Sequence, residues 1–203
     1  MRVLVACEFS GVVRDAFTAL GHTAVSCDLL PSERPGAHIH GDVLEVLEDG
    51  WDLMIAHPPC THLAVSGARW FAGKQAEQAE ALDFVRRLLD APIPRVALEN
   101  PVSVISSRIR KPDQIIQPWM FGHPEAKTTC LWLRELPRLV PTDILPLPES
   151  GRWENQTPSG QNRLGPSPTR WMERSRTYEG LARAMAEQWG RLSTAVDQPR
   201  LWD

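Results

Sequence analysis

The 203-residue chain has the length expected for one α/β domain with its own core and at most a small appendage. Its net charge of −3 excludes a general attraction to nucleic acid, so such contacts need a local basic surface. We expect neither a signal sequence nor a membrane span, because no run approaches roughly 20 apolar residues. The 4 cysteines form no CxxC pair, which favours free thiols and a cytoplasmic location.

Strands and helices alternate in the first half of the chain, as a parallel α/β sheet requires. Short apolar runs predict the strands, and an amphipathic stretch that Gly21 ends predicts a helix. Asp28 stands at the carboxyl end of the second strand. The expected strands are 3–7, 23–27, a segment ending near Gly41-Asp42-Val43, and 53–56, and the expected helix is 12–20.

The second half begins with helical apolar spacing over 74–89 and a strand-like run, 94–98, so we expect the sheet to continue to Glu99. Residues 137–168 are crowded with Pro, Gly, Ser, Asn and Gln, which predicts a small irregular lobe. Residues 178–192 return to a helical pattern. Arginine and tryptophan are interleaved around the lobe, as is typical where phosphates and unstacked bases are held: Arg152, Trp153, Arg163, Arg170, Trp171, Arg174 and Arg176.

The sequence Pro58-Pro59-Cys60 places a thiol just past the strand 53–56, where open α/β sheets bind ligands. Glu99-Asn100-Pro101 follows the next strand and brings a carboxylic acid to the same crevice. A thiolate that adds to carbon 6 of cytosine makes carbon 5 nucleophilic, and an acid at nitrogen 3 eases the addition. We therefore predict covalent base chemistry, with Cys60 as nucleophile, Glu99 as an acid of raised pKa, and Asn100 steadying the loop.

The methyl donor for this chemistry would be S-adenosylmethionine. Its ribose diol and adenine amine call for carboxylates at strand ends, which Asp28 and Asp42 supply. Phe9 is the candidate for the apolar face of the adenine.

In collinear order, these features resemble the cytosine-5 DNA methyltransferase family, in a compact form of the sort expected in phages. Residues 7–11, Cys-Glu-Phe-Ser-Gly, resemble its Asp-x-Phe-x-Gly cofactor loop, with Cys7 in place of the acid and Val13-Arg14 in place of later glycines. Residues 52–60 resemble its catalytic segment, with His57 replacing the last glycine, and Thr61 then replaces a glutamine.

Glu99-Asn100-Pro101 resembles the family's Glu-Asn-Val. Residues 121–129 resemble its Tyr-Gly-x-Pro-Gln-x-Arg-x-Arg segment, where Lys127 stands for the first arginine and Thr129 for the second. Arg69-Trp70-Phe71 and a terminal helix with Tyr178 and Gly180 also resemble family positions. The resemblance implies these catalytic residues: Cys60, Glu99, Asn100 and Lys127. It implies these cofactor-binding residues: Phe9, Ser10, Gly11, Asp28, Asp42, His57 and Pro58.

The resemblance also implies a Rossmann-like class I S-adenosylmethionine-dependent methyltransferase fold with a small irregular C-terminal lobe. We expect a catalytic domain over 1–133, a reduced target-recognition lobe or insertion over 134–177, and a helix within 178–203 that packs back on the catalytic domain. So small a lobe favours single-stranded or loosely specified DNA over sequence-specific duplex DNA. The expected partner is DNA, single-stranded or duplex, and the expected state is a monomer in the cytoplasm, that of the host if phage-encoded.

Structural interpretations of the same residues stay open. Cys7, Cys27 and Cys130 are interpreted as core residues. Asp28 and Asp42 are also typical loop caps, Lys127 is also typical of a solvated charge, and the arginine and tryptophan run could pack the lobe.

Different functions for these residues also stay open. His57, Cys60 and His62, with His38 and His40, are metal-ligand types, but the chain lacks the His-x-Glu and Pro-Cys-x-x-Cys of zinc deaminases, so no metal is expected. A donor with an altered alkyl group, with His57 or Thr61 lining its pocket, would need the same nucleophile and acid. The same residues are compatible with RNA or a free nucleotide as the substrate, and with a non-catalytic nucleic-acid-binding relative.

Overall fold

The computed structural model describes residues 1–65, 73–159, 162–165 and 167–192. Arg69-Trp70-Phe71 and residues 193–203 lie outside these described residues. The strands are β1 (Arg2–Ala6), β2 (Thr23–Asp28), β3 (His38–His40), β4 (Leu53–Ala56), β5 (Arg95–Pro101), β6 (Gln114–Ile116) and β7 (Thr129–Arg134). The helices are α1 (Val12–Ala19), α2 (Gln75–Leu89), α3 (Ile105–Arg108), α4 (Arg170–Ser175) and α5 (Glu179–Trp189).

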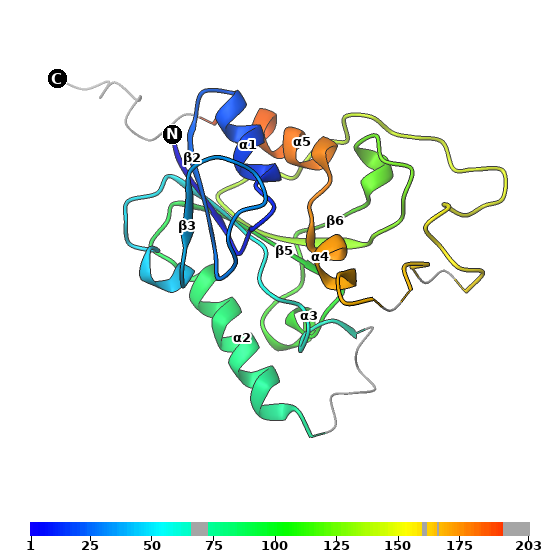
Figure 1. Cartoon of the computed structure of the whole chain (residues 1–203), viewed down its shortest axis with the longest axis horizontal. Coiled ribbons are helices and arrows are strands. Elements are labelled where there is room, and N and C mark those ends of the chain that lie inside the picture. The colour runs from blue at the N-terminus through cyan, green and yellow to red at the C-terminus, as the bar shows by residue number, and fades with distance from the viewer. Residues whose placement is uncertain (66–72, 160–161, 166, 193–203) are drawn as a thin grey trace.

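The strands form one seven-stranded sheet in the order β3-β2-β1-β4-β5-β7-β6 (Figure 1). β1 to β5 pair in parallel, whereas β7 runs antiparallel to both β5 and β6. The strand order reverses beside β1, which is where doubly wound sheets form their ligand crevice. This topology is that of a Rossmann-like methyltransferase fold, so the predicted fold class is confirmed.

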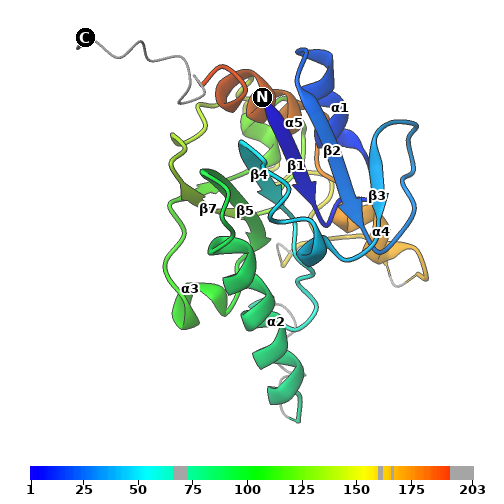
Figure 2. The same cartoon turned by 90° about the vertical axis from the view of Figure 1, so that its left-hand side faces the viewer.

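The central strands are buried on both faces, which explains why they are apolar throughout. Successive side chains of a strand point to opposite faces of the sheet. Val5 and Ile55 therefore lie in the core beneath α1 and α5, while Leu4 and Met54 lie in a second core beneath α2. Figure 2 shows α2 on the side of the sheet away from α1 and α5. The continuous apolar run of β4 is thus the signature of a strand between two helical layers.

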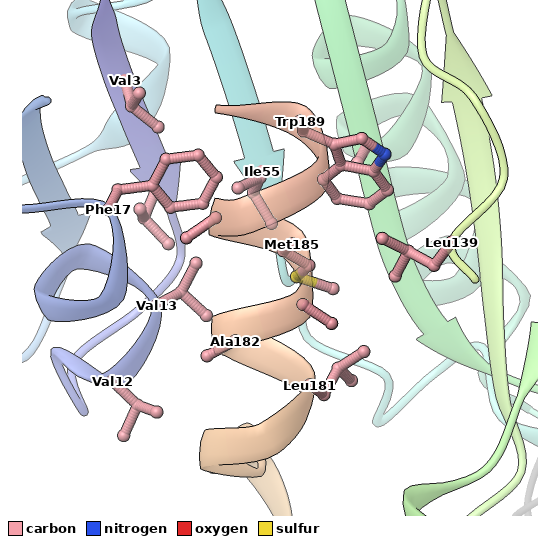
Figure 3. Packing of buried hydrophobic residues seen from close by; sticks show 14 of the residues in the cluster. Val3, Val12, Val13, Phe17, Ile55, Leu139, Leu181, Ala182, Met185 and Trp189 are labelled. Carbon is pink, nitrogen blue, oxygen red and sulfur yellow. The ribbon is translucent and has the colours of Figure 1, made fainter. Parts of the chain in front are cut away.

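The helix α5 packs against α1, which lies far from it in the sequence (Figure 3). Its small residues Ala182 and Ala186 are fully buried and allow the two helices to approach closely. Met185 and Trp189 fill the space over the sheet, and the Trp189 indole N–H donates to the Pro137 carbonyl at 2.9 Å. α5 is therefore part of the main core.

The start of α5 lies so close to residues 121–123 that only glycine fits at position 180. A Cβ on Gly180 would lie 2.0 Å from the Phe121 carbonyl oxygen. We expect Gly180→Ala to lower the free energy of unfolding in urea by about 1–3 kcal/mol. Gly165→Ala is the matched control, because nothing lies within 4 Å of its Cβ position. Equal losses in both variants would show that the close approach of α5 is not the cause.

β6 and β7 were not among the strands that the sequence analysis predicts. Cys130 to Leu133 form an apolar run, but residues 121–129 before them show the pattern of a family motif and not that of a strand. β7 adds to the edge of β5 in antiparallel register, from Pro101↔Thr129 to Val96↔Arg134. The sheet therefore extends past Glu99 and is mixed, because β7 reverses direction.

Between β7 and α4, the described residues contain no helix or strand. Trp153 is buried and stacks on Trp119, with ring centroids 6.5 Å apart. Asn155 bonds both the N–H and the carbonyl of Ala126, at 3.0 and 2.9 Å. Part of this irregular region is thus fixed to the segment before β7. No helix in the described ranges is long and apolar enough to cross a bilayer.

Candidate active site

Cys60 lies in a turn just beyond the carboxyl end of β4. The Cys60 carbonyl accepts hydrogen bonds from the N–H groups of Leu63 and Ala64, at 3.0 and 2.9 Å. Its side chain is exposed, whereas Cys27 and Cys130 are buried and Cys7 is half-buried. Cys60 is therefore the cysteine whose thiol is most accessible to a substrate.

β5 positions both the acid and the thiol loop. The Asn100 side-chain amide donates to the Pro58 carbonyl at 3.0 Å, which ties the loop to the end of β5. Glu99 precedes Asn100 on this strand and acts electrostatically on the Cys60 thiol. The pairing of β4 with β5 thus brings together two residues that are about forty positions apart in sequence.

The Glu99 carboxylate is held in its ionised form. Burial raises the pKa of this group, but the close approach of His57, the positive charge of Lys127 and a hydrogen bond from Thr129 outweigh it. The net pKa of Glu99 is therefore lowered, and the expected raised value is wrong. The reason is that the protein around Glu99 supplies positive and hydrogen-bonding groups, rather than an apolar pocket.

The Cys60 thiol experiences opposing influences. Burial against the surrounding protein raises its pKa, although one side of the residue is exposed, and the negative charge of Glu99 raises it further. The positive charges of Arg174 and Lys127 act in the opposite direction but do not cancel the rise. In the free protein the thiol is therefore mainly protonated at neutral pH.

We expect iodoacetamide to alkylate Cys60 slowly at pH 7, with a rate that rises about tenfold per pH unit to beyond pH 9. The thiolate is the reactive form, and its fraction grows with pH until the pKa is passed. Peptide mass spectrometry would follow the reaction, with the buried Cys27 and Cys130 as internal controls. Rapid alkylation of Cys60 at pH 7 would contradict a raised pKa.

Lys127 links the segment before β7 to α4. Its ammonium donates to the Arg174 carbonyl at 2.7 Å and lies over the Tyr178 ring, 5.6 Å from the centroid. The Tyr178 hydroxyl donates to Glu125 at 2.6 Å. Lys127 is thus held near Cys60 and Glu99, and its ammonium group already donates one of its hydrogen bonds within the protein.

The loop after β1 is built around a buried carboxylate that the sequence analysis did not single out. Glu8 is 4% exposed and accepts hydrogen bonds from the Val13 N–H at 2.7 Å and the Ser10 hydroxyl at 3.1 Å. Glu8 therefore accepts hydrogen bonds from backbone N–H groups at the amino-terminal end of α1. These groups have no partner within the helix and favour a negative charge nearby. The sequence signal that could have identified it is an acidic residue directly after the apolar run of β1 and just before the helix. Gly11, at φ 74°, enters the helix in the left-handed region.

Arg14 occupies the space next to this loop. Its buried guanidinium bonds Ser26, Ser32 and the carbonyl of Pro35. A Cβ on Gly11 would lie 2.5 Å from this group, so the glycine makes room for the arginine. Arg14 thereby fixes the loop after β2 against α1.

Asp28 and Asp42 lie at the carboxyl ends of β2 and β3, and both cap local turns. Asp28 accepts from the Leu30 N–H at 2.9 Å and Asp42 from the Leu44 N–H at 2.9 Å. Burial raises the pKa of Asp28, whereas Asp42 is exposed. Each carboxylate has capacity for further hydrogen bonds. The loop-cap interpretation is therefore observed, and a ligand role stays a prediction.

Phe9 lies beneath α4. Its ring is nearly buried and packs against Trp171, with centroids 5.9 Å apart. Arg176 pairs with Glu33 at 2.6 Å, and the Glu33 N–H donates to the Phe9 carbonyl at 2.8 Å. Two members of the arginine and tryptophan run thus hold α4 over the predicted cofactor loop.

Two surface hollows in the described part of the chain, of about 430 and 350 Å³, lie along α2 and beside residues 135–137, and Cys60 lines neither of them. Within the described residues, no group of three or more His, Cys, Asp or Glu side chains is arranged to hold a metal ion.

The reversed sheet order, with a thiol and a carboxylate at adjacent strand ends, defines a protein of Rossmann-like methyltransferase fold. No protein-family model matches the sequence, and no curated protein is similar to it. Among solved structures, the chain is similar to a protein described as a DNA modification methyltransferase encoded within an E. coli prophage, with 13% identity and a TM-score of 0.47 over 72% of this chain and 52% of that one. It is also similar to a mutant of DNMT2 from Spodoptera frugiperda, with 15% identity and a TM-score of 0.38 over 75% of this chain and 56% of that one. The chain thus spans about half the length of these structures.

Proposed function

We propose that the protein is an S-adenosylmethionine-dependent DNA cytosine-5 methyltransferase that acts through a covalent adduct. The observation that carries this proposal is the exposed Cys60 thiol beside Glu99, at the carboxyl ends of β4 and β5. Cys60 adds to carbon 6 of cytosine, and Glu99 faces nitrogen 3. Asn100 acts by holding the loop through the Pro58 carbonyl. The positive charge of Lys127 offsets the electrostatic repulsion between the Glu99 carboxylate and the phosphates of DNA.

The donor site belongs to the crevice beside β1, where the strand order reverses. Asp28, half-buried at the end of β2, fits the ribose diol, and Asp42 fits the adenine amine. Phe9, Ser10 and Gly11 would border the donor at the end of β1. Pro58 would border it from the β4 side, as would His57. When bound, the sulfonium donor supplies the methyl group that carbon 5 attacks.

The substrate would be single-stranded or loosely specified DNA. A cytosine must leave the base stack before Cys60 can reach it, which costs a few kcal/mol in a duplex and least in a single strand. The described residues between β7 and α4 form only a small irregular region to compensate for that cost. Lys127 and Arg174, which act on the thiol, supply positive charge at the mouth of the crevice.

The test is a product analysis with purified protein, S-adenosylmethionine, and either single-stranded or duplex DNA. After digestion to nucleosides, mass spectrometry should find 5-methylcytosine, with more in the single-stranded sample. A cytosine with a different substituent would identify another donor. No modified cytosine in either DNA would overturn the proposed reaction and favour a nucleotide substrate or a binding role.

A further inference from the structure

The His57 side chain is buried without a hydrogen-bond partner among the described residues. Only 8% of it is exposed, and neither Nδ1 nor Nε2 has a partner at hydrogen-bond distance. Leaving such a buried polar atom unpaired costs about 1–3 kcal/mol. The Asn100 side-chain oxygen and the Ser103 hydroxyl are also unpaired, and both lie near the same loop. This concentration of unpaired polar atoms points to a functional use of the ring.

The His57 ring faces the Glu99 carboxylate. Nδ1 of His57 lies 3.6 Å from Oε2 of Glu99, within ion-pair range and slightly beyond hydrogen-bond length. The His57 backbone N–H donates to the Ala6 carbonyl at 2.9 Å, which fixes the residue between β1 and β5. A small movement of either side chain would allow a direct proton transfer.

The groups around His57 and Glu99 include positive charges and a neutral thiol. Lys127 acts on Glu99 from the segment before β7, and Arg174 acts on Cys60 from α4. On the β1 side, Cys7 follows Ala6, and burial raises the pKa of its thiol, so it is neutral. The lowered pKa of Glu99 means that its carboxyl group does not by itself hold a proton at neutral pH. The acid at nitrogen 3 therefore needs a source for its proton.

We propose that His57 supplies, through Glu99, the proton that nitrogen 3 of cytosine takes when Cys60 adds to carbon 6. This inference rests on the proposed function. The Cys60 thiol first gives its proton to water. The thiolate pair then forms the S–C6 bond, the C5=C6 pair moves to C4=C5, and the C4=N3 pair takes the proton from Glu99. Nδ1 of the imidazolium replaces that proton, so the charges of thiolate and imidazolium disappear together. On reversal the proton returns by the same route.

The inference predicts a distinctive pH profile. A protonated His57 beside Glu99 can resupply the proton that the carboxyl group, with its lowered pKa, does not hold by itself at neutral pH. His57→Asn retains an N–H near the position of Nδ1 but cannot carry a positive charge. The addition step should therefore be about 100-fold slower in this variant at pH 7, and the difference should shrink as the pH falls to the lowered pKa of Glu99, where its carboxyl group acquires a proton of its own.

The measurement is the release of tritium from DNA that contains [5-³H]cytosine, without any methyl donor. Addition of Cys60 makes carbon 5 nucleophilic, so it takes a proton from water and loses the triton on reversal. A difference that shrinks with falling pH supports the proton route. Equal rates at every pH, or a constant difference at every pH, would overturn the role of His57. Absence of any Cys60-dependent release by the wild-type protein would overturn the proposed function, and this inference with it.

Discussion

Cys60→Ala is expected to reduce 5-methylcytosine formation to background while leaving the fold intact. The thiol is exposed in a turn, so its loss opens no core cavity. Without it, no group can form the bond to carbon 6 that makes carbon 5 nucleophilic. The affinity for S-adenosylmethionine, measured by calorimetry, should change less than about twofold, since the residues proposed to bind the donor are kept.

The covalent bond itself can be captured. In the presence of S-adenosylmethionine, DNA with 5-fluorocytosine should form a denaturation-resistant complex with the wild-type protein, because after methyl transfer fluorine cannot leave carbon 5 as a proton does. Cys130→Ala is the matched control, since that buried thiol belongs to the core. Full turnover by Cys60→Ala, or a complex that survives in it, would exclude Cys60 as the nucleophile.

Glu99→Gln is expected to slow covalent addition by about 10²–10⁴-fold, the usual contribution of a positioned general acid. Glutamine keeps the shape of the side chain and can donate a hydrogen bond, but it cannot pass a proton to nitrogen 3. The same change removes the negative charge that raises the Cys60 pKa. Alkylation of Cys60 by iodoacetamide should therefore become faster at a given pH.

The opposite signs of these two effects make the experiment specific. General damage to the site would change both rates in an unpredictable way, whereas loss of the acid slows addition and speeds alkylation. Glu179→Gln is the matched control, because Glu179 is an exposed partner of Arg34 far from the thiol in sequence. Undiminished addition by Glu99→Gln would move the activating acid to another residue.

The amino-terminal part of the sheet could be predicted because its strands are buried on both faces. β4 covers the four residues that the apolar run predicts, and α1 and α2 each match to within one residue at either end. β6 and β7 could not be predicted in the same way. β6 is a three-residue edge strand with one buried residue, so it carries little hydrophobic pattern.

The candidate site was predictable in its residues but not in its protonation. Strand ends identified Cys60 and Glu99, since parallel strands bring their carboxyl ends to one edge. The lowered pKa of Glu99 depends on His57 and also on Lys127 and Thr129, and the last two reach Glu99 because β7 pairs with β5. Lys127 was expected at a base or phosphate, yet it also binds the Arg174 carbonyl.

The sequence alone determined the succession of the buried strands along the chain, the place of the thiol and the acid, and the irregular character of the region after β7. These features follow from local patterns of apolar, turn-forming and polar residues. Only the tertiary structure decided the reversal of β7, the packing of α5 on α1, the burial of Glu8 and the approach of His57 to Glu99. Those features depend on contacts between distant parts of the chain, and the energies of charges and buried polar groups depend on such contacts most strongly.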